Sequence, residues 1–142
     1  MHTFKIGETH FGIDLSESTL LVQKRKDGLV ELTLDVAGDQ ATFDRLTEAE
    51  DGEWSWALYP PTFFIHGLPM SQEAADIAAP IHIEESGEDV EMGLYMMEYS
   101  DVFEVSLQLD ASGLLLVQGR VDLWGKNLRF EIGMPCEQRA GT

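Results

Sequence analysis

The stretch FEVSLQLDASGLLLVQGRVDLWGKNLRFEI, residues 103–132, decides the predicted fold. Three of its segments alternate apolar and polar residues: 103–109, 117–123 and 128–132. Such alternation puts every second side chain on one face of the chain and is typical of a half-buried β-strand. Asp110–Gly113 and Trp124–Asn127 separate the segments and contain the Asp, Asn and Gly residues that favour turns. The stretch therefore predicts three consecutive antiparallel strands.

The same pattern continues outside this stretch. Val30–Val36 alternates in the same way and follows Lys26-Asp27-Gly28, whose Asp-Gly pair favours a tight hairpin. Shorter strands are predicted around Ile81–Glu84 and Val90–Met97, on either side of an acidic turn. Short strands joined by turns at this spacing predict a mostly β protein, an antiparallel β-sandwich or a barrel-like meander.

Helical segments are short in this sequence. Gln40–Glu50 and Ser71–Ala78 are the two candidates, so we expect one or two short helices beside the sheets. A chain of 142 residues fits one domain. We expect a single β-rich domain over residues 1–134 and a flexible C-terminal tail over residues 135–142.

A short internal echo raises the question of a duplication. Leu20-Leu-Val-Gln23 recurs as Leu115-Leu-Val-Gln118, and similar residues precede each copy. Two related three-strand units could produce such an echo. Any two β-meanders rich in Leu and Val could produce it as well, and we favour this second explanation.

Aromatic residues concentrate in WSWALYPPTFFIHGLPM, residues 54–70. Alternation puts Thr62, Phe64 and His66 on one strand face, and Phe63 and Ile65 on the other. We expect most of these aromatic rings to be buried in the core, because burying a ring of this size contributes about 1.5–3 kcal/mol. Trp54 and Tyr59 are the predicted exceptions, because their polar groups seek water or a hydrogen-bond partner.

The net charge is −17, from 26 acidic and 9 basic residues. Residues 44–104 contain 15 of the acidic residues and one basic residue, Arg45, so that most of the excess lies in the middle of the chain. This charge opposes binding to nucleic acid and to anionic membrane surfaces. It favours encounter with a basic protein.

We therefore predict that the acidic middle segment docks a basic protein partner. The expected binding residues are the aromatic Trp54 and Tyr59 and three carboxylates of the acidic turn: Glu85, Glu88 and Asp89. A tyrosine or tryptophan in an acidic field can anchor a protein interface or a cation.

No pattern of residues identifies catalysis or a cofactor. The sequence has no Gly-x-Ser-x-Gly motif and no phosphate-binding loop, and Cys136, the single cysteine, lies in the predicted tail. No metal site is predicted, and the weak alternative is His82 with Glu84, which share one face of a short strand. With no disulfide and no signal peptide, we expect a cytoplasmic protein.

Three functions stay open at this point. The first is a non-enzymatic, acidic binding module, similar to inhibitor or immunity proteins in composition only. The second is a β-barrel that binds a small ligand, or a small hydrolase, in which residues 54–66 line a pocket and His66 or His82 moves a proton. The third is a structural protein that self-associates, for example as a homodimer.

Overall fold

The computed structural model describes residues 3–24, 26–48, 59–70, 81–83, 90–96, 99–109, 114–123, 125–135 and 139–141. They form one helix and twelve strands, in the order β1 (Thr3–Ile6), β2 (Thr9–His10), β3 (Ile13–Lys24), β4 (Val30–Gly38), α1 (Gln40–Thr47), β5 (Thr62–Met70), β6 (Ile81–Ile83), β7 (Glu91–Tyr95), β8 (Tyr99–Ser100), β9 (Val102–Leu109), β10 (Leu114–Leu123), β11 (Lys126–Pro135) and β12 (Arg139–Gly141). The prediction of a mostly β protein is confirmed.

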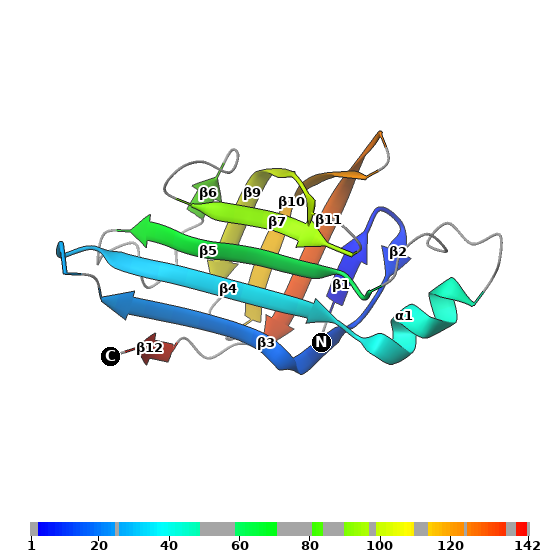
Figure 1. The fold of residues 1–142 in the computed structure, drawn as a ribbon, viewed down its shortest axis with the longest axis horizontal. Coiled ribbons are helices and arrows are strands. Elements are labelled where there is room, and N and C mark those ends of the chain that lie inside the picture. Colours follow the sequence, from blue (N-terminus) through cyan, green and yellow to red (C-terminus); the bar gives the residue numbers. More distant parts are fainter. Residues whose placement is uncertain are drawn as a thin grey trace.

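The strands form two separate sheets. The first sheet has the order β2-β1-β11-β10-β9-β6, and the second has the order β12-β3-β4-β5-β7-β8. Neighbouring strands are antiparallel except β12, which runs parallel to β3. Figure 1 shows the second sheet in front, with its strands crossing steeply over β9, β10 and β11. The described residues form no closed barrel, so the fold is that of a β-sandwich.

The hydrophobic core fills the space between the two sheets. Along β4, buried and partly exposed residues alternate over the whole strand, and Val30, Leu32, Leu34 and Val36 are all buried. From β5, Phe63 faces the core and meets Phe130 of β11 in the opposite sheet, with 5.1 Å between the ring centroids. The alternation predicted for β4, β9, β10 and β11 is therefore the pattern that builds the core.

Turns and the helix follow local sequence signals. The β3–β4 hairpin turns at Asp27 and Gly28, where the Asp27 side chain accepts a hydrogen bond from the Leu29 amide and Gly28 has φ +86°. The Asp39 side chain caps α1 by accepting from the Ala41 amide at 3.1 Å. This helix confirms the first candidate, although it ends at Thr47, and the second candidate, Ser71–Ala78, lies outside the described residues.

The structure describes part of the segment for which a flexible C-terminal tail was predicted. β11 includes Pro135, and β12 pairs with β3 inside the segment for which a flexible tail was predicted. The mobility of that segment stays a prediction.

The internal echo can also be compared with the structure. The first copy, with its upstream residues, lies in the single strand β3, whereas the second copy is divided between β9 and β10. The two copies therefore differ in topology.

Candidate functional site

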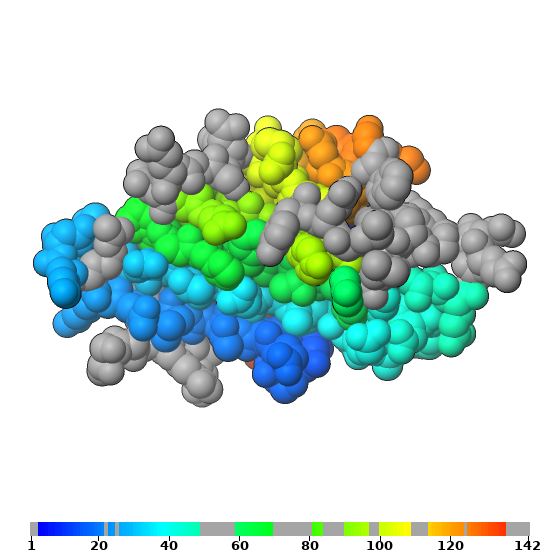
Figure 2. Space-filling view, viewed as in Figure 1, coloured from blue at the N-terminus to red at the C-terminus, as the bar shows by residue number. Residues whose placement is uncertain are grey.

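A groove lies on the outward face of the second sheet, where β4, β5 and β7 are neighbours. Its volume is about 370 Å³, and six side chains line it: Asp35, Thr62, Phe64, His66, Glu91 and Tyr95. Strand register brings them together, because Asp35 is opposite Phe64, His66 is opposite Glu91 and Thr62 is opposite Tyr95. Figure 2 shows this side of the molecule, with β4 in cyan and β5 in green lying side by side. We call this feature the aromatic groove.

Alternation along β5 separates the groove from the core. Phe63 and Ile65 are fully buried between the sheets, and the intervening residues project outward. The predicted division of this segment into two faces is confirmed. The aromatic stretch thus serves both sides of the sheet, with core residues on one face and groove residues on the other.

His66 lies between two carboxylates. Its Nε2 atom is 2.7 Å from Oδ1 of Asp35, and Glu91 is its cross-strand neighbour on the other side. The His66 and Asp35 side chains are 46% and 35% exposed, so the pair is open to solvent. Two carboxylates on adjacent strands give this part of the surface a local negative potential that His66 compensates only when it is protonated.

Phe64 is buried on β5, although it is not part of the main hydrophobic cluster. Its side chain is only 6% exposed, and its ring centroid is 5.0 Å from that of His66. Gly93 lies opposite Phe64, and a Cβ atom there would be 3.0 Å from Cζ of the ring. The absence of a side chain at Gly93 is what lets the ring pack against β7.

Two tyrosines extend the aromatic surface at one end of the groove. The rings of Tyr59 and Tyr95 are stacked, with 5.9 Å between centroids and 19° between planes. The Tyr59 amide donates to the Met96 carbonyl at 2.9 Å, which fixes the backbone before β5. Tyr59 is 50% exposed, as predicted from its polar group, and its ring is available to a partner.

Of the five binding residues predicted from the sequence, the structure describes one. Tyr59 lies next to the groove, through its stacking on Tyr95. Trp54, Glu85, Glu88 and Asp89 lie outside the described residues. Sequence reasoning missed Asp35, because nothing in β4 alone indicates that its solvent-facing carboxylate meets a histidine 31 residues later.

His82 and Glu84 were the weak alternative to the prediction that the protein has no metal site. His82 is exposed on β6, and Glu84, its proposed companion, lies outside the described residues. Among the described side chains, no three His, Cys, Asp or Glu residues come together in a group that could hold a metal ion.

A larger hollow, of about 670 Å³, lies where β3 bulges away from β4. Its hydroxyl groups already hold the bulge together: Ser16 donates to the Asp14 side chain, and Ser18 donates to the Asp14 carbonyl and accepts from the Ala37 amide. Asp35 is its single charged lining residue. With one carboxylate and no aromatic side chain, this hollow is less suited to a cation than the aromatic groove.

Comparison of the chain with protein-family models, curated proteins and solved structures found no match. In the part of the chain that the structure describes, no helix has the length and apolar character needed to cross a membrane.

Proposed function

We propose that the protein is a non-enzymatic binding module whose aromatic groove docks a basic protein partner. The observation that carries this proposal is the arrangement of Asp35 and Glu91 in one groove with Tyr95, whose ring stacks on the exposed ring of Tyr59. Both kinds of group stabilise a bound cation, the carboxylates by charge and the aromatic rings through their negative faces.

The preferred contact is a single Arg or Lys side chain from the partner. A guanidinium or ammonium group over the exposed ring of Tyr59 gains about 0.5–1 kcal/mol from the cation–π interaction, and up to about 2 kcal/mol when water is excluded. A charge-assisted hydrogen bond to Glu91 adds about 1.5–3 kcal/mol before the cost of ordering is subtracted. One such anchor gives weak binding, so a tight complex needs several basic residues on the partner.

The charge distribution supports the same partner. β5 and β7 belong to residues 44–104, the range with 15 acidic residues and one basic residue. Five of these acidic residues are described by the structure, so the position of the others relative to the groove stays a prediction. A negative field around the groove would raise the association rate with a basic protein at low salt.

The exposure of the histidines favours a binding surface over a hydrolase pocket. A proton-transfer site was expected to enclose His66 or His82, yet His66 is 46% exposed and His82 is on the exposed side of an edge strand. Large apolar side chains exposed in the described residues are Leu15, Leu29 and Tyr59. Because one lies in β3 and the other two lie in separate connections, they support self-association less well than the groove supports a basic partner.

A titration with a defined basic probe tests the proposal. An acetylated and amidated Gly-Arg-Gly peptide is added at low salt, and backbone amide shifts are followed by NMR. We expect saturable shifts at β4, β5 and β7, which weaken as the salt concentration rises. The double variant Asp35→Asn/Glu91→Gln should lose at least about tenfold in affinity.

The control is Glu17→Gln/Glu48→Gln, which changes the net charge equally at exposed sites outside the groove. Immobilised forms of the three proteins are then compared in capture of basic proteins from a lysate. Shifts spread over the whole surface, or equal losses in the two double variants, would show that total charge and not the groove binds the peptide.

A further inference from the structure

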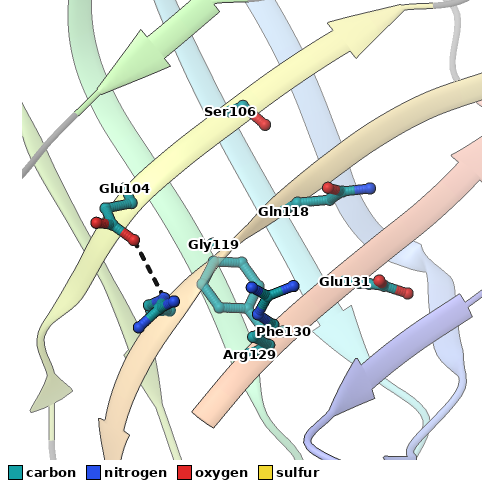
Figure 3. A pocket seen from close by; sticks show the side chains of 8 residues that line it. Glu104, Ser106, Gln118, Gly119, Arg129, Phe130 and Glu131 are labelled. Atoms are coloured by element: carbon teal, nitrogen blue, oxygen red, sulfur yellow. Dashed lines mark ion pairs between the residues drawn. The ribbon is translucent and has the colours of Figure 1, made fainter. Parts of the chain in front are cut away.

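A second hollow lies on the outward face of the first sheet, on the opposite side of the sandwich from the aromatic groove. Its volume is about 170 Å³, and its floor is formed by Gly119 of β10 and Phe130 of β11. Six side chains surround it, two from each of three adjacent strands: Glu104 and Ser106 from β9, Gln118 and Arg120 from β10, Arg129 and Glu131 from β11. Figure 3 shows this ring around Gly119, and we call it the Gly119 hollow.

The cations of the hollow are placed side by side. Arg120 and Arg129 are directly opposite each other in the β10–β11 register, where like charges destabilise the sheet. They are two of only seven lysine and arginine side chains that the structure describes.

The two arginines differ in their partners. Arg120 Nε is 3.1 Å from Oε2 of Glu104, and its Nη1 is 3.4 Å from Oδ1 of Asn127. Within the described residues, no carboxylate lies within ion-pair distance of Arg129. Arg120 is therefore held in place, and Arg129 keeps its donors for a ligand.

The backbone at Glu104 is strained, and its conformation accompanies the ion pair between Glu104 and Arg120. Glu104 has φ +51°, in the left-handed region that costs a residue with a side chain about 1–3 kcal/mol. It lies at the β-bulge where Glu104 and Val105 of β9 are opposite the single residue Gly119 of β10. A bulge of this kind redirects a side chain, and here it directs the Glu104 carboxylate onto the Arg120 guanidinium.

We propose that the Gly119 hollow binds the carboxylate group of a small organic acid. Arg129 donates two parallel hydrogen bonds to the carboxylate, as guanidinium and carboxylate groups do in their most stable geometry. The Gln118 amide and the Ser106 hydroxyl supply neutral donors on the other side. This proposal does not depend on the aromatic groove.

Charge and size select a carboxylate over a phosphate. Glu104 neutralises Arg120, which leaves Arg129 and Glu131 as the other two charges of the lining, and Lys5 of β1 is the cross-strand neighbour of Glu131. Glu131 repels a singly charged carboxylate less than it repels a doubly charged phosphate. A hollow of about 170 Å³ accommodates the head of a small acid and leaves the rest of the ligand in solvent.

The test is an NMR titration of the intact protein with sodium acetate at constant ionic strength, maintained with sodium chloride. Saturable shifts are expected at the amides of Gln118–Arg120 and Arg129–Glu131 and at Nε of Arg129. Arg129→Gln should weaken acetate binding at least about tenfold. Glu131→Gln should strengthen it several-fold, because a carboxylate that lines the hollow is removed.

Arg45→Gln is the matched control, since Arg45 is exposed on α1 and its loss changes the net charge equally. It should leave acetate binding unchanged. Linear shifts without saturation, or equal weakening in Arg129→Gln and Arg45→Gln, overturn the proposal. A second titration with sodium phosphate, again at constant ionic strength, overturns the choice of a carboxylate if phosphate binds more tightly than acetate.

Discussion

Replacing Gly119 with alanine tests how closely the two sheets are packed beneath the Gly119 hollow. A Cβ atom at Gly119 would lie 2.8 Å from Cε1 and 2.9 Å from Cζ of Phe130, and 3.1 Å from the Phe103 carbonyl oxygen. Contacts below 3.0 Å require a neighbour to move. Phe130 cannot move freely, because it is 1% exposed and packs against Phe63 of the opposite sheet.

The expected cost of Gly119→Ala combines two opposing effects. Overpacking of a filled core destabilises by about 1–3 kcal/mol. Replacing glycine restricts the unfolded chain and returns about 0.4–1 kcal/mol. The net loss in the free energy of unfolding should be about 1–2 kcal/mol, and urea denaturation measures it directly.

A double-mutant cycle with Phe130→Leu identifies the cause. Phe130→Leu alone should cost about 1–2 kcal/mol, because it leaves space in the core. If the clash is with the Phe130 ring, the double variant should be more stable than the sum of the two single losses by about 1 kcal/mol. Purely additive losses would refute this reasoning.

Gly133→Ala provides the control within the same sheet. A Cβ atom there would meet Leu116 Cδ2 at 3.7 Å and Thr3 Cβ at 4.0 Å, which are ordinary contacts. With no clash, only the unfolded-state effect remains, and Gly133→Ala should be neutral or stabilising by up to about 1 kcal/mol.

Three further substitutions test local features. Glu104→Gly should be more stable than Glu104→Ala by about 1 kcal/mol in urea denaturation, the reverse of the usual order in a strand, because only glycine relieves the positive φ; equal stabilities would mean that the backbone at this position is not strained. Asp39→Ala should lose about 1 kcal/mol with the cap of α1, while Asp39→Asn keeps most of it; an equal loss in both would exclude the cap as the cause. Tyr59→Leu should weaken Gly-Arg-Gly binding several-fold at a cost of less than about 1 kcal/mol in unfolding, because the Tyr59 ring is 50% exposed; unchanged peptide affinity would remove the Tyr59–Tyr95 stack from the proposed site.

The elements of the fold were predictable where local patterns determine them. The alternation in Val30–Val36 corresponds to a strand with one buried face, and Asp27-Gly28 lies at the hairpin turn. In these segments the side-chain period and the turn residues act over a few positions, so one sequence contains the needed information. The two faces of β5 were predictable from the same alternation.

Register between distant strands could not be predicted in this way. β4 and β5 are neighbours although 23 residues separate Gly38 from Thr62, and their pairing is what brings Asp35 to His66. The left-handed backbone at Glu104 was equally unpredictable, since glutamate is not a residue that favours positive φ. The aromatic groove and the Gly119 hollow depend on these long-range or strained features. Neither complete set of lining residues could therefore be identified from the sequence.

The opposite chemistry of the two faces follows from distance as well as from sequence. Packed sheets lie about 10 Å apart, so side chains that project outward from the two sheets are farther apart still, and ions in the surrounding solvent screen exposed charges beyond about 8 Å at physiological salt. Each outward face therefore experiences mainly its own side chains, so Arg129 can attract an anion although the chain has a net charge of −17. Asp35 and Glu91, on the other sheet, can attract a cation for the same reason. Because the screening length shortens as salt is added, acetate binding at Arg129 should suffer less repulsion from the rest of the chain at moderate salt than at very low salt. Peptide binding at the aromatic groove should weaken as salt is added, because screening reduces the attraction between the peptide and the carboxylates of Asp35 and Glu91. The two sites of one protein should therefore respond differently to salt.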